Sequence, residues 1–221
     1  MTETEDSVTR KPAPLALRNE DDFLQEQAQL MRASVYELLA NLLAREPDQA
    51  LIAALAGIEE VDTDEGQVAM GWELLRQAAG KEDAATMAAS IKDEYFNLFL
   101  GVGRGELVPF GSWYLTGFLM EKPVSVLRAD LAALGIERQD GITDTEDHIA
   151  ALCDTMAIII RSGDEIEFAR QQQFFTDHID PWAVRFFTDL QSAKSASFYR
   201  SVGFFGESFI EFEQQLLSMK V

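Results

Sequence analysis

The chain has 221 residues, of which 47% are hydrophobic and 25% are charged, and this composition is typical of a globular protein that buries a sizeable core. Its 38 acidic side chains outnumber the 18 basic ones, which leaves a formal net charge of −20. Such a surface repels nucleic-acid phosphates and anionic lipid, so we expect no nucleic-acid partner, whereas a basic peptide would be attracted. The alternative is that the acidity serves only solubility.

The start of the chain predicts a tail, and its single cysteine predicts a reducing environment. Residues 1–19 are polar and acidic without periodicity, so we expect them to be flexible. They lack the basic start and apolar run of a secretory signal, and no apolar stretch reaches the ~20 residues that span a bilayer. Cys153 excludes an internal disulfide and is expected to be buried on an apolar helical face. We therefore expect a cytoplasmic protein without stable membrane insertion.

Apolar residues spaced three and four apart predict helices from residue 20 onward. The first helix should end at Pro47, and a short one should cover 49–58. A third should end at Gly80, and a fourth should run over 81–100 to Gly101.

The glycine-rich stretch 101–112 predicts an irregular loop, and loops of this length in compact domains usually bind something. A short helix is predicted at 113–121, and Pro123 suits the first turn of a helix that ends at Gly135. Residues 136–144 predict a linker between two lobes, 20–135 and 145–221. The remaining predicted helices cover about 145–162, 164–178, 181–194 and 196–219. The chain is therefore predicted to be all-α, a single compact domain of about ten helices.

Acidic residues and one of the two histidines precede an apolar helical run. Thr143 and Glu146 have the spacing of a capping box, and Thr145 could equally be the cap, so Glu146 and Asp147 are predicted in the first helical turn. This end of a helix disfavours a charged imidazole, so His148 is expected to be neutral. A capped helix with a satisfied histidine explains the pattern. A corner that docks a ligand through the carboxylate and the imidazole is the alternative.

Motifs for catalysis and metal binding are weak. The GVGRG stretch lacks the Gly-Lys-Ser/Thr ending and the preceding strand of a phosphate-binding loop. No nucleophile motif accompanies His148, and His178 has no second histidine or cysteine at helical spacing. We expect no catalytic residue and no metal. A nucleotide hydrolase that uses Asp147 and His148, and a purely structural helical adaptor, are the remaining alternatives.

Five segments carry a family resemblance. They are EYFNLFLGVG, PFGSWYL, EDHIAALCDTMA, DHIDPWAVRFF and SFYRSVGFF. In this order, over about residues 90–212, the chain resembles the TorD/DmsD family of cytoplasmic redox-enzyme maturation chaperones. The resemblance implies an all-helical TorD-like fold without catalysis or cofactor, although GTP binding has been suggested for some members. It also implies a monomer or a dimer that exchanges helices.

The function implied by the resemblance is client protection. Such a chaperone binds the twin-arginine signal peptide or the apo form of a molybdenum-cofactor oxidoreductase, of the DMSO or TMAO reductase or formate dehydrogenase type. It holds this client until cofactor insertion and export. Carboxylates would meet the arginines of the peptide, and aromatic side chains would cover its apolar run. Pro181 and Trp182 are interpreted as packing residues. Matched to the family motifs, the expected client-binding residues are Tyr95, Leu98, Phe99, Pro109, Phe110, Gly111, Ser112, Tyr114, Glu146, Asp147 and His148.

Overall fold

The computed structural model describes residues 20–60, 66–137, 144–163 and 166–219. Within these ranges the chain forms ten α-helices, one π-helical turn and no strand, which confirms the predicted all-α class. The predicted tail 1–19 and most of the predicted linker lie outside the described residues. The elements are α1 (Glu20–Ala44), α2 (Gln49–Ala56), α3 (Gln67–Ala79), α4 (Ala84–Tyr95), η2 (Phe96–Leu100), α5 (Gly111–Thr116), α6 (Lys122–Ala133), α7 (Ile149–Arg161), α8 (Phe168–His178), α9 (Ala183–Ser192) and α10 (Phe198–Ser218).

Local capping explains where several helices begin. The Asp48 carboxylate accepts a hydrogen bond from the Leu51 backbone N–H at 2.8 Å at the start of α2. At the start of α4, the Asp83 carboxylate accepts from two backbone N–H groups at 3.1 Å. Pro123 lies in the first turn of α6, as predicted. The aspartates accept hydrogen bonds from backbone N–H groups that have no partner inside the helix. Proline has no N–H, so it leaves one fewer such group to satisfy.

Two predicted boundaries are wrong for local reasons, and a third is confirmed. The helix predicted at 113–121 is instead α5, which ends at Thr116 because Gly117 takes a left-handed conformation with φ 81°. The helix predicted to start at 145 begins only at Ile149, because the preceding residues form a turn against α5. The end of the fourth predicted helix is confirmed, because the helix continues through the π-helical turn η2 and stops at Gly101, whose φ is 59°.

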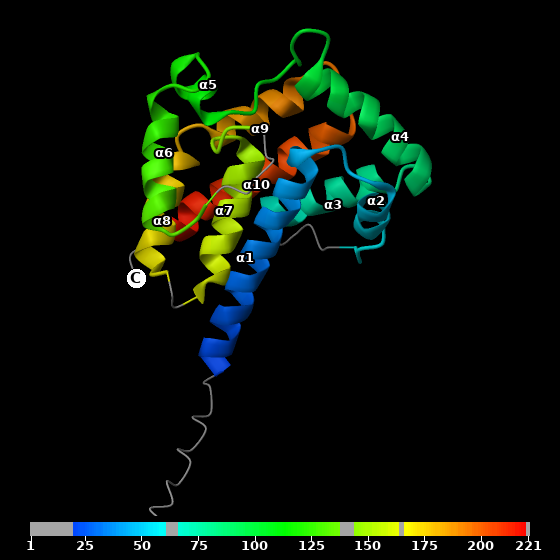
Figure 1. Cartoon of the computed structure of the whole chain (residues 1–221). Coiled ribbons are helices and arrows are strands. Elements are labelled where there is room, and N and C mark those ends of the chain that lie inside the picture. The colour runs from blue at the N-terminus through cyan, green and yellow to red at the C-terminus, as the bar shows by residue number, and fades with distance from the viewer. Residues whose placement is uncertain (1–19, 61–65, 138–143, 164–165, 220–221) are drawn as a thin grey trace, which may run out of the picture.

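The helices pack as one body in which α1 and α10 are the long elements (Figure 1). Helix α1 lies along α7, and α10 lies against α9 and α3. Helices α2, α3 and α4 pack together, whereas α5 packs on α6. Elements from before and after the 136–144 segment therefore pack directly on one another. The first turns of α1 extend beyond the body in Figure 1.

Aromatic side chains fill the core. The large side chains with less than 2% exposure include Trp182, Tyr36, Tyr199, Phe175, Phe186, Phe187 and Phe205. Gly206 lets α10 approach α9, since a Cβ at this position would lie 2.2 Å from the Phe187 ring. Cys153 is fully buried, as predicted, and burial raises the pKa of its thiol. The core is thus closed over the middle of α7.

Two buried carboxylates tie distant helices together. Glu213 on α10 pairs with Arg32 on α1 at 2.6 Å and accepts a hydrogen bond from the Tyr36 hydroxyl at 3.1 Å. Glu94 on α4 accepts from the backbone N–H groups of Ser197 and Tyr199 at 2.8 and 2.7 Å. The Glu94 carboxylate therefore caps α10 from another element.

Candidate client-binding site

The end of the 101–110 loop joins the segment that precedes α7. Phe110 and His148 form an isolated antiparallel bridge, flanked by backbone hydrogen bonds of 2.9 Å from Gly111 N to Asp147 O and from Ile149 N to Pro109 O. The rings of Phe110 and His148 meet edge to face with centroids 4.9 Å apart. Five of the residues predicted for the client-binding site, counted among the described ones, therefore meet Ile149 in one corner.

Asp147 is held inside this corner. Its Oδ2 atom accepts from the Ser112 backbone N–H at 2.7 Å, and its Oδ1 atom accepts from the Thr145 hydroxyl at 2.5 Å. The residue is only 3% exposed. The carboxylate thus fixes the start of α5 against the turn before α7, and it presents little surface to a ligand.

His148 is the N-cap of α7. Its Nδ1 atom accepts from the Ala150 backbone N–H at 3.1 Å, which requires an unprotonated Nδ1. Burial lowers the pKa of His148 from 6.5 to about 4, against the opposing charges of Asp144 and Asp147. The expectation of a neutral imidazole is confirmed.

The predicted threonine cap is wrong, and so is the placement of the two acids in the first turn. Thr145, Glu146 and Asp147 all precede α7. The imidazole of His148 can take the cap because the Asp147 carboxylate is already engaged by α5. Glu146 reaches sideways to α6, where its Oε2 atom accepts from Arg128 Nη2 at 2.9 Å and Nε at 3.0 Å.

Tyr95, Leu98 and Phe99 belong to a different environment. Tyr95 is 7% exposed and donates its hydroxyl hydrogen to the Leu43 carbonyl oxygen at 3.3 Å, while burial raises its pKa to about 12. Leu98 is completely buried. The half-buried Phe99 ring packs against Tyr95 at 4.9 Å and Tyr199 at 5.4 Å. The structure places this aromatic cluster in the core beneath the loop, where Asp144 adds its charge to both Tyr95 and His148.

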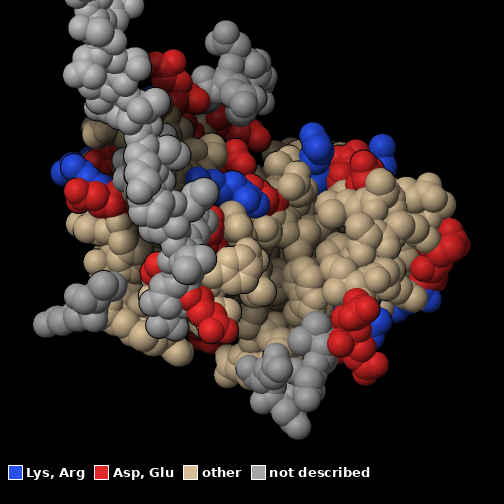
Figure 2. Space-filling model, turned by 90° about the horizontal axis from the view of Figure 1, so that it is seen from below, with Lys and Arg blue, Asp and Glu red and all other residues tan. Residues whose placement is uncertain are grey.

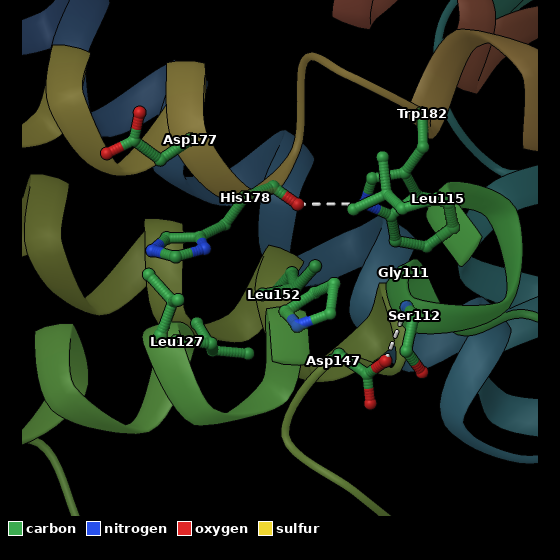
Figure 3. A pocket seen from close by; sticks show the side chains of 11 residues that line it. Gly111, Ser112, Leu115, Leu127, Asp147, Leu152, Asp177, His178 and Trp182 are labelled. Carbon is green, nitrogen blue, oxygen red and sulfur yellow. Dashed lines mark hydrogen bonds between the residues drawn. The ribbon is translucent and has the colours of Figure 1, made fainter. Parts of the chain in front are cut away.

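A pocket of about 230 Å³ opens beside the corner (Figure 3). Of the residues predicted for the site, only Gly111, Ser112 and Asp147 line it. The rest of the wall comes from α5, α6, α7, the end of α8 and the residue before α9, through Leu115, Pro123, Val126, Leu127, Leu152, Asp177, His178 and Trp182. The pocket is therefore largely apolar, with two carboxylates and an imidazole among its lining groups.

Sequence reasoning missed the far wall of this pocket. Trp182, predicted to be a packing residue, is 1% exposed and also forms part of the wall, and its indole N–H donates to the His178 carbonyl oxygen at 2.8 Å. His178, rather than His148, is the histidine of the pocket, and its Nε2 atom lies 2.8 Å from an Asp130 oxygen. The apolar stripe of α6, which begins shortly after α5 in the sequence, was the available signal.

Tyr114 turns away from the pocket. It lines a separate hollow of about 440 Å³ between α5 and α9, and its hydroxyl donates to Asp189 at 3.0 Å. Burial raises the pKa of Tyr114, and the charge of Asp189 adds to this effect. Nearby, the Arg104 guanidinium lies over the Trp113 ring, 4.3 Å from its centroid.

Three further features concern surface charge, metal binding and membrane insertion. Acidic and basic side chains surround uncharged areas on the face shown in Figure 2. Within the described part of the chain, no group of three or more His, Cys, Asp or Glu side chains is arranged to hold a metal ion. No helix in that part is both long and apolar enough to cross a membrane.

Comparison with known proteins finds one matching family model and several similar proteins. The family model described as "Nitrate reductase delta subunit" matches residues 62–188, which is more than half of the chain. The chaperone protein TorD of Vibrio atlanticus is 26% identical over 206 residues, which cover 85% of this chain and 94% of that protein. TorD of Vibrio cholerae serotype O1 is 26% identical over 70% of this chain and 77% of its own. TorD of Shewanella loihica is 22% identical over 83% and 92%.

Proposed function

Since this chain belongs to the TorD/DmsD family of redox-enzyme maturation chaperones, we propose that it binds the twin-arginine signal peptide of a molybdenum-cofactor oxidoreductase. It acts as a chaperone and not as an enzyme, in line with the names of its relatives. It holds the apo client in the cytoplasm until the cofactor is inserted and export can begin.

The observation that carries this proposal is the pocket beside the Asp147 corner. A twin-arginine signal peptide, called the leader below, is basic at one end and apolar in its middle. The pocket offers apolar walls from α5, α6 and α7, and its charged lining groups include Asp147 and Asp177. A net charge of −20 attracts the basic end over longer distances. Apolar burial and charge attraction thus act on the two parts of the same peptide.

Asp147 and His148 have a positioning role in this proposal. Both side chains are buried and hydrogen-bonded within the protein, which by itself also suits a purely structural adaptor. Their effect on client binding comes from holding α5, the 101–110 loop and the start of α7 in register, and thereby shaping the pocket.

Calorimetric titration of the purified chain with synthetic leaders tests the proposal. The leaders are taken from the molybdoenzymes encoded in the same genome. We expect saturable binding of one leader per chain for at least one of them. The same peptide in scrambled order is the control, because it keeps the composition and charge but breaks the separation of basic and apolar parts. If no leader binds more tightly than its scrambled control, the proposal is wrong.

A further inference from the structure

Exposed apolar side chains gather where α5 turns into α6. We call this group the elbow, and it consists of Leu115, Phe118, Leu119, Met120 and Val126. Their exposed fractions are 41%, 68%, 50%, 68% and 46%. Five large apolar side chains within twelve positions of the chain are more than the scattered single residues of an ordinary surface. Such a cluster indicates a docking surface.

The backbone holds the elbow in its exposed form. Met120 has φ 60°, a left-handed conformation that is uncommon for a residue with a side chain. Its N–H donates to the Ser112 hydroxyl oxygen at 3.2 Å, while the Thr116 hydroxyl donates to the Ser112 carbonyl oxygen at 2.8 Å. Ser112 is in turn fixed by Asp147. The exposed Met120 is thus connected to the buried corner through the hydrogen bonds of Ser112.

The elbow continues into the pocket. Leu115 and Val126 belong to both, because each is exposed on the elbow and also lines the pocket wall. A cavity of about 150 Å³ is enough to take up a benzene ring, so about 230 Å³ has room for a large apolar side chain. An exposed apolar surface beside a pocket of this size suits a helical segment that inserts one anchoring residue.

Charge selects the occupant. The pocket is lined by the carboxylates of Asp147 and Asp177, and Glu121 lies at the start of α6 next to the elbow. A second copy of this chain carries the same charge of −20 and is repelled. An apolar segment with a basic flank is attracted, and the leader of the proposed client has this chemistry.

We propose that the elbow is the docking surface for the apolar run of the leader, and that the pocket receives one large apolar side chain of that run. This inference rests on the proposed function, and it adds which part of the peptide meets which part of the chaperone. The basic end of the leader then lies toward the acidic groups around the pocket.

Two elbow variants test the inference by calorimetric titration with the leader. Met120→Gly removes the side chain and also the conformational strain, so the folded state should keep its melting temperature or gain slightly. Phe118→Ala removes the largest exposed ring of the elbow. We expect each variant to weaken leader binding about tenfold, and the double variant more.

The controls are exposed residues of the same types on α1, where Met31 is 70% and Phe23 is 52% exposed. Met31→Ala and Phe23→Ala should leave leader affinity within about twofold of the unsubstituted chain. A leader whose apolar run is replaced by serine and glycine should bind the chain and the elbow variants equally weakly.

A fluorescence measurement locates the peptide independently. Since Cys153 is buried, the thiol of Phe118→Cys can be labelled selectively with an environment-sensitive dye. Leader binding should shift the emission of this dye to the blue, whereas a dye on Phe23→Cys should be unaffected.

The outcomes separate the two proposals. If the unsubstituted chain binds no leader, the proposed function fails. If the chain binds the leader while both elbow variants bind within about twofold and the dye emission is unchanged, the proposed function stands and the elbow inference is overturned.

Discussion

His148 combines a structural role with a sensitivity to acid. Its ring caps α7 through Nδ1 and is nearly excluded from water, and the pKa falls from 6.5 to about 4. In the unfolded chain the histidine regains its ordinary pKa, so between these two values the unfolded state binds more protons. The free energy of unfolding contributed by His148 is therefore fully present above about pH 6.5 and is lost as the pH falls toward 4.

The variant His148→Asn isolates this contribution. Asparagine can accept the same capping hydrogen bond but does not titrate. Between pH 7 and pH 4 we expect the free energy of unfolding of the variant to fall by about 3 kcal/mol less than that of the unsubstituted chain. Urea unfolding at several pH values measures this difference. Losing the ring contact with Phe110 can lower the variant's stability at every pH. Parallel pH curves would contradict the assignment.

The client-binding residues show how far sequence reasoning reaches at this scale. The resemblance led to Asp147, His148 and Phe110, and the structure brings these three together. It could not distinguish them from Tyr95 and Leu98, because motif residues that support a core and those that line a pocket look alike in a sequence. The pocket residues His178 and Val126 were missed, since α6 and α8 come together only in the folded chain.

Helix ends follow the sequence when the cap is local. Asp48, Asp83 and Gly117 act within a few residues of the ends that they fix, and the start of α2 after Asp48 matches the predicted position. Helix α10 is different, because its cap is Glu94 from α4, about a hundred positions earlier in the chain. Residue spacing contains no signal for such a contact, and the predicted start of this helix was two residues too early.

Substituting Glu94 tests the capping of α10 from a distance. Glu94→Ala leaves three backbone N–H groups at the start of α10 without this acceptor, and Phe198 and Tyr199 are buried there. We expect the free energy of unfolding to fall by about 2–4 kcal/mol, as measured by urea unfolding followed by circular dichroism. Asp93→Ala, an exposed neighbour on the same helix, is the control and should change stability by less than about 0.5 kcal/mol. A similar small effect for both variants would refute the cap.

At the scale of the whole molecule, stability depends on helices that are far apart in sequence. Helix α1 packs along α7, and it is fixed to α10 by the Arg32–Glu213 pair and by the contact of Tyr36 with Phe209. The helical class was predictable because the apolar spacing repeats along almost the entire chain. The arrangement of the helices was available only through the family resemblance, since no local pattern states which helices become neighbours.

Cys153 reports on the opening of this packing. The thiol is fully buried on α7, and its raised pKa disfavours the reactive thiolate. A thiol reagent should therefore modify the native chain at least about a thousandfold more slowly than the urea-unfolded chain. In Met31→Cys the added, exposed thiol should react at once and serve as the internal control. Rapid modification of Cys153 in the native protein would show that α1 separates readily from α7.

The position of Trp182 gives the molecule an optical reporter of its own. The indole forms part of the pocket wall, and its N–H is already taken by the His178 carbonyl. The other two indoles lie elsewhere, with Trp72 against Phe205 and Trp113 beneath Arg104. Replacing those two by phenylalanine leaves Trp182 as the single tryptophan. The quantum yield of its fluorescence should then change when a ligand enters the pocket. Occupancy can then be followed in real time without attaching any probe.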